Sequence, residues 1–383
     1  MTVWIVNPFD NLPTEGNRPQ RYWLMARAFA KAGYKFVFWS SDFSHATKAK
    51  RKFVRECDDG FEVRLVPTRP YPKNICLKRI ISHWHLAKDW LRLARMEVNR
   101  PDVIIASTPP LGLCNAARKY AHEVKAKFVA DIMDAWPETF YRVVPRWMLL
   151  PLRCVAKKIY TKADAISAVS KRYIELAKSY GATASMHCCN HGIEIREEGR
   201  AKREEGRALN LVYIGAMGLS YDLETVIDAV KSLECATLDL AGSGPKEAAL
   251  RLQASGCERI RFHGYLGDVE LRDLLLRSTI GIIPMFPDSC VGIPYKLADY
   301  AACGLKIVES LGGEAGELVS KHNAGCHYNA GDVDSLREAI LVAASIKDPN
   351  PSAFSAHFDA VRIMSEYVGW IENVARHKRN GNG

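Results

Sequence analysis

The stretch Ile283–Glu309, IPMFPDSCVGIPYKLADYAACGLKIVE, decides the fold of this chain. An apolar strand ends at Ile283-Pro284, a loop rich in proline and glycine follows, and Tyr295–Cys303 has the composition of a short helix. Gly304 stands where a C-cap glycine belongs, and Leu305–Val308 is the next apolar strand. A strand, a loop, a helix and a second strand in this order are typical of a parallel α/β sheet.

The helix of this stretch carries a lysine and an aspartate near its beginning. Ligands of parallel sheets bind at the carboxyl ends of the strands, and a helix N-terminus attracts phosphate through its unpaired N–H groups and its dipole. Lys296 adds a full positive charge there. Asp299, one turn later on the same face, can accept hydrogen bonds from the two hydroxyls of a ribose. The pattern predicts a site for a nucleoside diphosphate.

The segment Ile293–Tyr300, IPYKLADY, resembles the donor-site signature of retaining glycosyltransferases with the GT-B fold. The resemblance is to the family-4 type group, which builds bacterial surface polysaccharides. Its usual signature has a glutamate, seven residues and a second glutamate. Asp299 stands at the second acid and Val291 at the first. Members that read Pro-x-Lys-x-x-Glu-Tyr also lack the standard first glutamate, and this chain resembles that version with aspartate for glutamate.

A corner in the first half of the chain resembles the same group. Asp134–Glu138, DAWPE, follows the expected strand Lys127–Ile132. In the family this corner lines the cleft between the domains near the transferred sugar. The resemblance therefore makes Asp134 and Glu138 candidates for contacts with sugar hydroxyls. An ordinary alternative makes Asp134 a helix N-cap.

The resemblance assigns the remaining site residues. Glycines in the loops after strands let the backbone approach a ligand closely, and the turn after the strand Arg261–His263 commonly touches the nucleotide base in relatives. Met217 stands near the place where many members carry an arginine and a lysine, so Lys296 has to neutralise more of the diphosphate. The catalytic candidates are Asp134, Glu138 and Lys296, and the donor-binding candidates are Gly16, Gly215, Gly218, Gly264, Tyr265, Leu266, Lys296, Leu297 and Asp299.

The resemblance also implies the architecture. We expect two Rossmann-like domains facing each other across a cleft, with a C-terminal helix that crosses back to the first domain. The acceptor-side domain is expected over 1–194 together with the helix over 354–377, and the donor-binding domain over 208–350. A length of 383 residues suits two domains of ordinary size.

Several patterns argue against other classes of protein. Asp332-Val333-Asp334 precedes a helical run, which favours an N-cap over a metal site, so no metal and no cofactor besides the donor substrate is expected. The 11 cysteines include no Cys-x-x-Cys pair, which favours reduced thiols. The sequence has neither an apolar run of about 20 residues nor the pattern of a signal peptide. These features predict a cytoplasmic protein, or one peripheral at the inner face of the cell membrane.

The positive charge lies in the first half of the chain. Residues 1–190 hold 32 Lys and Arg against 16 Asp and Glu, although the net charge of the whole chain is +10. This asymmetry predicts an anionic partner such as a membrane leaflet or a lipid-linked diphosphate, unless the charges only solvate the surface. Two segments are candidates for a membrane surface or for ordinary core packing: Arg146–Tyr160, and an expected helix Lys78–Val98 with Ile80, Trp84, Ala87, Leu91, Ala94 and Val98 on one face.

The resemblance implies transfer of a sugar from a nucleotide diphosphate sugar, with a UDP-sugar favoured, to a hydroxyl of a lipid-linked glycan. The expected reaction retains the anomeric configuration, needs no metal, and serves polysaccharide, capsule or lipopolysaccharide synthesis. A non-catalytic nucleotide-sugar-binding or scaffold homologue is the first alternative, because the first glutamate and the Arg/Lys pair are missing. A nucleotide-sugar epimerase of the same fold is the second, and the 134–138 corner argues against it. Nucleic-acid binding lacks a matching motif.

Overall fold

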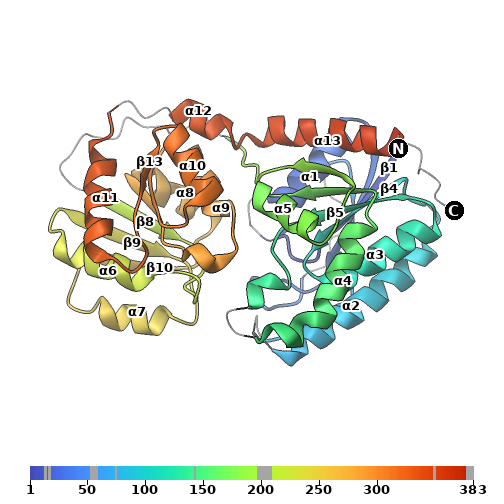
Figure 1. Cartoon of the computed structure of the whole chain (residues 1–383), viewed down its shortest axis with the longest axis horizontal. Helices are drawn as coiled ribbons and strands as arrows, with labels where there is room; N and C mark the ends of the chain where they lie inside the picture. The colour runs from blue at the N-terminus through green and yellow to red at the C-terminus, as the bar shows by residue number, and fades with distance from the viewer. Residues whose placement is uncertain are drawn as a thin grey trace. The chain divides into compact units, whose positions relative to one another are not determined.

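The computed structural model of this chain describes residues 1–12, 15, 19–51, 59–73, 76–141, 144–195, 209–347 and 351–376. The Rossmann-like character expected from the sequence is confirmed, because the chain forms two compact α/β units (Figure 1). Unit 1 consists of Met1–Gly192 and Val361–Gly383, and unit 2 consists of Ile193–Ala360.

Unit 1 is built on a seven-stranded sheet with the order β3-β2-β1-β4-β5-β6-β7. All neighbouring strands are parallel, so their carboxyl ends meet at one edge of the sheet. Strand β4 is buried along its whole length, as expected for a parallel strand covered on both faces. The strands are β1 (Thr2–Val6), β2 (Lys35–Ser41), β3 (Glu62–Val66), β4 (Val103–Thr108), β5 (Lys127–Ile132), β6 (Ala165–Ala168) and β7 (Ser185–Cys188).

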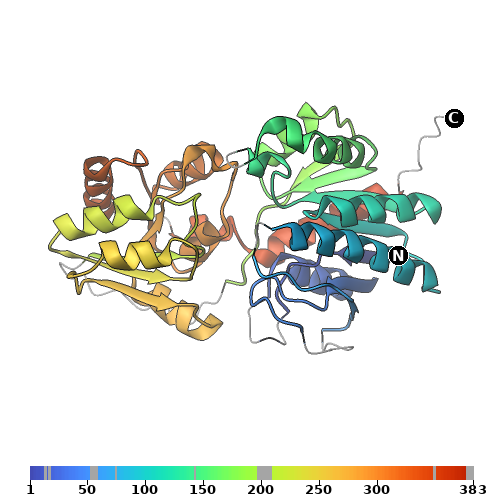
Figure 2. The same cartoon turned by 90° about the horizontal axis from the view of Figure 1, so that it is seen from below.

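Helices cover both faces of this sheet. Figures 1 and 2 show α2, α3 and α4 on one face and α1, α5 and α13 on the other. Their bounds are α1 (Arg21–Lys31), α2 (Leu77–Met96), α3 (Leu111–Glu123), α4 (Leu150–Thr161), α5 (Lys171–Ser179) and α13 (Ala360–Arg376), with short 3-10 helices η2 (Glu138–Phe140) and η3 (Arg146–Leu149) before α4. Because the helices that follow the strands run back along the sheet, the N-termini of α2 and α4 lie at its carboxyl edge.

Helix α2 packs with a different face from the one expected. Its buried residues are Ser82, His83, Leu86, Trp90 and Ala94. Trp90 contacts the rings of Trp39 and Tyr120, and these contacts explain why the side of α2 that carries Trp90 packs against the core. Of the apolar residues expected on one face, Ala94 is buried, but Ile80, Trp84 and Val98 are exposed to 65%, 56% and 92%, so core packing is wrong for these three.

The single amphipathic helix expected over 354–377 is two helices in the described part of this range. Helix α12 (Pro351–Ala356) belongs to unit 2, whereas α13 belongs to unit 1. The break arises because the backbone pairs with Ile193 instead of continuing the helix: Ile193 N donates to Phe358 O, and Ala360 N donates to Ile193 O. Phe354 and Phe358 pack into the core of unit 2. The two apolar stretches therefore serve different cores.

Side chains anchor α13 on unit 1. The Tyr367 hydroxyl lies 3.0 Å from that of Ser167, and the Tyr34 hydroxyl donates to Glu372 at 2.7 Å. The His187 and Trp370 rings stack with centroids 5.1 Å apart. Helix α13 thus completes the unit to which β1 belongs.

Unit 2 is built on a six-stranded parallel sheet with the order β10-β9-β8-β11-β12-β13. Its strands are β8 (Leu209–Ile214), β9 (Ala236–Ala241), β10 (Ile260–Gly264), β11 (Ile280–Ile283), β12 (Lys306–Glu309) and β13 (Gly325–His327). The helices that accompany α12 are α6 (Leu223–Ser232), α7 (Glu247–Gln253), α8 (Asp268–Arg277), α9 (Tyr295–Ala302), α10 (Gly313–Lys321) and α11 (Val333–Ser345), and η4 (Pro287–Ser289) precedes α9.

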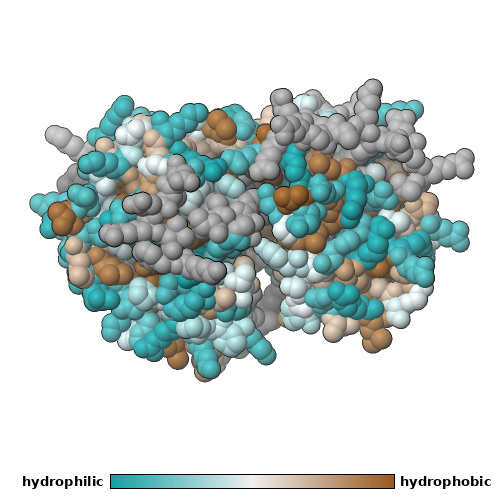
Figure 3. Space-filling model, turned by 180° about the vertical axis from the view of Figure 1, so that it is seen from behind, coloured by the Kyte–Doolittle hydropathy of each residue, from teal (hydrophilic) through white to brown (hydrophobic). Residues whose placement is uncertain are grey.

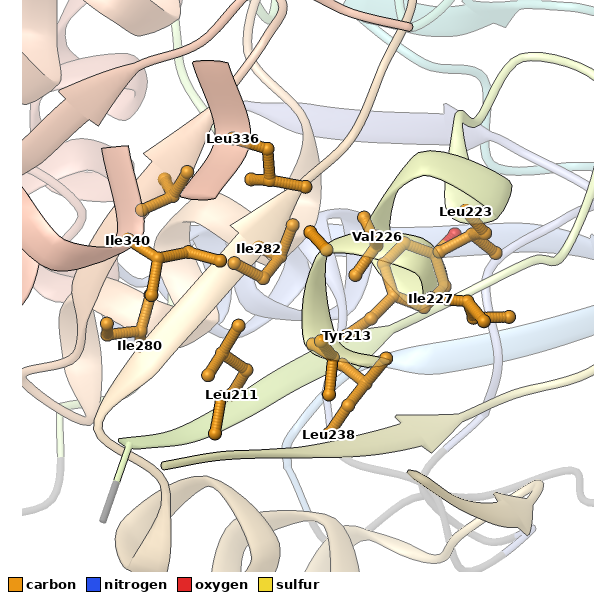
Figure 4. Close-up of a cluster of buried hydrophobic side chains, with 14 of the residues drawn as sticks. Leu211, Tyr213, Leu223, Val226, Ile227, Leu238, Ile280, Ile282, Leu336 and Ile340 are labelled. Atoms are coloured by element: carbon orange, nitrogen blue, oxygen red, sulfur yellow. The ribbon is translucent and has the colours of Figure 1, made fainter. Parts of the chain in front are cut away.

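The core of unit 2 forms as the apolar runs predict. Figure 4 shows one cluster, in which Leu211 and Ile280 from the strands face Val226 of α6 and Ile340 of α11. At the start of α11 the side chain of Asp332 accepts the Ser335 N–H at 2.9 Å. The predicted N-cap is therefore confirmed.

Two features bear on the class of protein. Among the described residues, none of the helices combines the length and the apolar character needed to cross a membrane. Within the same part of the chain, His, Cys, Asp and Glu side chains form no group that could hold a metal ion.

Candidate active site

Lys296 lies in the first turn of α9, at the carboxyl edge of the unit 2 sheet. Its side chain is 6% exposed, and Nζ lies 4.0 Å from the ring centroid of Tyr213 and 4.1 Å from that of Tyr221. Within the described part of the chain, Nζ has no hydrogen-bond partner. Burial lowers the pKa of Lys296 well below its ordinary value, and Asp299 opposes this shift. A buried amine in this state is costly, and a bound anion would satisfy it.

The loop after β8 passes close to this amine. A Cβ atom at Gly215 would lie 3.5 Å from Nζ of Lys296, and Gly215 has a φ of +123° that favours glycine. Its N–H donates to Ala241 O at 2.9 Å, and Met217 N donates to Ser243 O at 2.9 Å. The backbone of the loop is therefore fixed against the turn after β9, next to the lysine.

The turn after β9 needs its glycines because it approaches the backbone of the loop after β8 closely. A Cβ atom at Gly242 would lie 1.9 Å from the carbonyl oxygen of Gly215, and one at Gly244 would lie 2.4 Å from that of Met217. Gly242 N also donates to Gly264 O at 2.6 Å, which joins the turn after β10 to the other two. The three loops at this edge form one hydrogen-bonded frame.

The structure places most of the predicted donor residues around this frame. Gly218 follows Gly215, and a Cβ atom at either Gly218 or Gly264 would meet nothing within 4 Å. Tyr265 is 66% exposed beside Gly264, and Leu266 packs partly against the core. Asp299 is buried one turn after Lys296 in α9. Gly16 lies outside the described residues.

Leu297 lies in the core beneath α9. Its side chain is fully buried in the core of unit 2, and its N–H donates to Pro294 O at 3.0 Å. The Leu297 side chain therefore supports the helix that carries Lys296, and a contact of Leu297 with a donor stays a prediction. Val291, at the position of the missing acid, packs partly against the same core, and Met217 is fully buried.

The aromatic surroundings of Lys296 were not predicted. Tyr213 comes from the end of β8 and Tyr221 from the loop before α6, and the centroids of their rings lie 5.7 Å apart. Together the two rings cover the amine and give it cation–π contacts. The sequence offers no local signal for this arrangement, because the three residues come from separate segments.

In unit 1, the structure assigns Asp134 and Glu138 to different side-chain clusters. Asp134 follows β5, accepts the Ala135 N–H at 2.8 Å, and lies near the Arg79 guanidinium of α2. Burial raises the pKa of Asp134 to about 6. The N-cap of η2 is Pro137, so the alternative that made Asp134 an N-cap is wrong.

Glu138 lies toward α4 and α5. Its Oε1 accepts hydrogen bonds from the hydroxyls of Tyr180 and Tyr141, and Arg153 forms an ion pair with it at 3.8 Å. The Glu138 side chain is 13% exposed. One carboxylate oxygen is therefore already held by the protein, which suits a residue that positions the corner better than one that binds a sugar directly.

Two family models match the chain. The model described as Glycosyltransferase Family 4 matches residues 21–197, and the model described as Glycosyl transferases group 1 matches residues 208–345. No curated protein matches this sequence.

Solved structures show the same fold over nearly the whole chain. Sucrose-phosphate synthase from Thermosynechococcus elongatus is 12% identical with a TM-score of 0.76, covering 97% of this chain and 98% of its own. HepE from Anabaena in complex with UDP is 16% identical with a TM-score of 0.70, covering 97% and 100%. WaaG, a glycosyltransferase involved in lipopolysaccharide biosynthesis, is 13% identical with a TM-score of 0.63, covering 99% and 100%.

The family models account for both units, and the solved structures account for their fold. The predicted resemblance is thereby confirmed at the level of fold and enzyme class. The chain belongs to the GT-B glycosyltransferases, with a family-4 first unit and a group 1 second unit.

Proposed function

We propose that this glycosyltransferase takes its sugar from a UDP-sugar, binds the diphosphate at Lys296, and transfers the sugar to a hydroxyl of a lipid-linked glycan at a membrane. The observation that carries the donor assignment is the buried amine of Lys296, which has no hydrogen-bond partner in the described part of the chain. Retention of the anomeric configuration rests on family membership alone.

The donor assignment follows from what the transfer needs. The bond to the sugar breaks with negative charge developing on the diphosphate, and a fixed cation in a water-poor site stabilises that charge. Lys296 supplies the cation, the backbone at Gly215 lies beside it, and we assign the N–H groups near Gly218 in the same loop to the diphosphate as well. We assign the ribose to Asp299 and the base to the turn at Gly264–Leu266. The UDP and UDP-glucose complexes of HepE support the choice of nucleotide.

On unit 1 we assign hydroxyl contacts of a sugar to Asp134. Its pKa of about 6 allows this carboxyl group to accept or hold a proton near neutral pH. We assign a positioning role to Glu138, which acts through Tyr141 and Tyr180 on the segment that carries Asp134.

The donor assignment predicts selective stabilisation by one nucleotide. UDP at 100 times its dissociation constant should raise the free energy of unfolding by about 2.7 kcal/mol, which gives a clear increase in Tm. The measurement is thermal unfolding of the full chain with UDP, GDP, dTDP and CMP. If only GDP or dTDP stabilises the protein, the proposed donor nucleotide is wrong and that nucleotide replaces UDP. If none of the four nucleotides stabilises it, the scaffold alternative is favoured.

A membrane-facing role is supported by exposed apolar side chains near the N-termini of α2 and α4. The list comprises Leu77 (77%), Ile80 (65%), Ile81 (50%), Trp84 (56%), Trp147 (71%), Met148 (54%), Leu150 (53%) and Leu152 (37%). We call these residues the apolar rim. Core packing, the alternative left open by the sequence, is excluded for them by their exposure.

Basic side chains accompany the apolar rim. Arg146 and Arg153 are sequence neighbours of Trp147 and Leu152, with their guanidinium groups near Tyr141 and Glu138. Lys88 Nζ lies 4.3 Å from the ring centroid of Trp84. On the face that Figure 3 draws, hydrophobic groups form separate small patches among hydrophilic ones. Apolar residues with neighbouring positive charge suit the headgroup region of an anionic bilayer.

Replacing Trp147, Met148 and Leu150 by serine is therefore expected to reduce sedimentation with vesicles that contain phosphatidylglycerol, because each apolar group lost removes burial in the bilayer. The matched control is Leu252→Ser, which changes a leucine exposed to 78% on α7 of unit 2. If the triple variant and the control sediment equally with the vesicles, the proposed membrane contact is wrong.

A further inference from the structure

A cluster of cationic, imidazole and aromatic side chains occupies the carboxyl edge of the unit 1 sheet. We call it the edge cluster, and its members are Phe9, His45, Lys48, Tyr71, Arg79, His83, Asp134 and Trp136. They come from the segments that follow β1, β2, β3 and β5 and from the first turns of α2. Because the strands are parallel, these segments converge at one edge.

Arg79 lies at the centre of the edge cluster. Its guanidinium carbon lies 5.1 Å from the ring centroid of Trp136, 5.6 Å from that of Phe9 and 5.9 Å from that of Tyr71. Its Nε lies 3.4 Å from Nε2 of His83. Three aromatic rings from three separate segments therefore hold the guanidinium in place.

Lys48 brings a second cation to the same place. Its Nζ donates to His45 O at 2.6 Å and lies 5.0 Å from the ring centroid of Tyr71. The Tyr71 hydroxyl lies 2.6 Å from Nδ1 of His45. The turn after β2 thus fixes the amine beside the aromatic group that also contacts Arg79.

The cluster brings two cationic side chains together in partly buried surroundings. Burial and the Arg79 charge lower the pKa of Lys48 to about 8. Burial and neighbouring cations lower the pKa of His45 and His83 to about 3. The cluster so defined contains two cationic side chains and one carboxyl group, Asp134, whose own pKa is raised by burial. Such a site gains when an anion enters it.

We infer that the edge cluster binds a phosphate ester on the acceptor, with the sugar next to that phosphate lying on the Trp136 and Phe9 rings. An arginine fork and an amine from different elements can reach several oxygens of one phosphate, whereas a carboxylate offers only two oxygens in a plane. Asp134, at the same edge, is placed to accept a hydrogen bond from a sugar hydroxyl. The inference rests on the proposed function, because it supplies the acceptor side of the transfer.

The test is calorimetric titration of the full chain with glucose 1-phosphate, inorganic phosphate, glucose and glucuronate. We expect Arg79→Gln and Lys48→Gln each to weaken binding of glucose 1-phosphate by about tenfold or more, since each removes a hydrogen bond to a charged group. Arg92→Gln is the matched control, because Arg92 lies on the same helix, is 62% exposed and should leave binding unchanged. Unfolding of each variant is followed by circular dichroism, and Arg79→Lys retains the charge if Arg79→Gln does not fold.

The outcomes separate this inference from the donor assignment. Loss of phosphate binding in Lys296→Met, with binding retained in Arg79→Gln, would place the phosphate on unit 2 and overturn the inference while supporting the donor site. Loss of phosphate binding in Arg79→Gln, together with no stabilisation of the protein by any nucleotide, would support the edge cluster as the phosphate site and would overturn the proposed donor. Binding of neither phosphate probe, or tighter binding of glucuronate, would overturn the inference.

The same variants distinguish two sources of the phosphate. Phosphatidylcholine vesicles with and without a polyprenyl phosphate are sedimented with the wild type, Arg79→Gln and Arg92→Gln. Sedimentation that needs both the polyprenyl phosphate and Arg79 identifies a lipid-linked phosphate, whereas Arg79-dependent binding of glucose 1-phosphate alone identifies a soluble sugar phosphate.

Discussion

Lys296→Met is expected to weaken UDP binding on the order of 100-fold, because it removes the cation that the proposal places on the diphosphate. A UDP concentration that stabilises the wild type by about 2.7 kcal/mol should then stabilise the variant by only about 0.4 kcal/mol. Thermal unfolding with and without UDP measures both values. The transfer reaction should fall with binding, since the same cation stabilises the leaving group.

The free variant should be no less stable than the wild type. Methionine fills the space between the Tyr213 and Tyr221 rings with a thioether, which makes favourable contacts with aromatic groups. The substitution also removes an amine whose burial opposes its charge. Loss of binding accompanied by an unchanged or higher Tm would separate a binding role from a structural one.

The control for Lys296→Met is Lys321→Met, which alters an exposed lysine on α10 of the same unit and should retain the full response to UDP. The pH dependence gives a second check. Burial lowers the pKa of Lys296 in the free protein, and a bound diphosphate would raise it. Binding then takes up a proton above the free pKa, so the affinity of the wild type for UDP should fall as pH rises, and the variant should lack this fall.

Asp131→Asn is expected to lower the free energy of unfolding by about 3–5 kcal/mol, because it leaves a buried arginine without its counter-charge. Asp131 and Arg21 are both fully buried and form two hydrogen bonds, at 2.9 and 3.1 Å. The Tyr22 and Ser167 hydroxyls also donate to Asp131, at 2.6 Å each. Chemical denaturation of the full chain measures the loss.

The matched control for Asp131→Asn is Asp89→Asn on α2, where the carboxylate is 37% exposed and lies 3.9 Å from Arg92. A change within about 0.5 kcal/mol is expected there. An equal loss of unfolding free energy in Asp131→Asn and Asp89→Asn would show that the buried ion pair contributes no more to stability than an exposed one.

Lowering the pH should destabilise the wild type through Asp131, and so reproduce part of the loss in unfolding free energy expected for Asp131→Asn. Burial alone would raise the pKa of Asp131, but the Arg21 guanidinium and the hydrogen bonds from Ser167 and Tyr22 outweigh it, so the pKa lies below its ordinary value. The associated stability is present above the ordinary pKa of about 3.9 and is lost as pH falls through the lower folded value. The variant should lack this component of acid sensitivity.

Local patterns predicted the elements whose signals are strong. The strand, helix and strand at β11, α9 and β12 follow from an apolar run, a proline-rich loop and a C-cap glycine. The cap at Asp332 follows in the same way. Strands β7 and β13 were not predicted, because four and three residues of mixed polarity at the ends of a sheet carry little periodicity.

The sites were predictable only in part. Lys296 stood out because its motif is local, whereas Tyr213 and Tyr221 reach it from segments more than 70 positions earlier. The edge cluster around Arg79 draws on five segments, so no single window of sequence contains it. Helix α2 has two apolar stripes, and only the contacts of Trp90 with Trp39 and Tyr120 decide which one turns inward.

Helix α13 has a consequence for the order in which the two units can form during synthesis. Domains generally fold as units while the chain emerges from the ribosome. Unit 2 is one continuous segment, Ile193–Ala360, and all of it has emerged before α13 does. At that stage unit 1 still lacks Glu372 and Tyr367, which contact Tyr34 and Ser167, because both residues follow unit 2 in the chain. Of these two units, the one whose synthesis begins first is therefore completed second, after all of unit 2 has been translated.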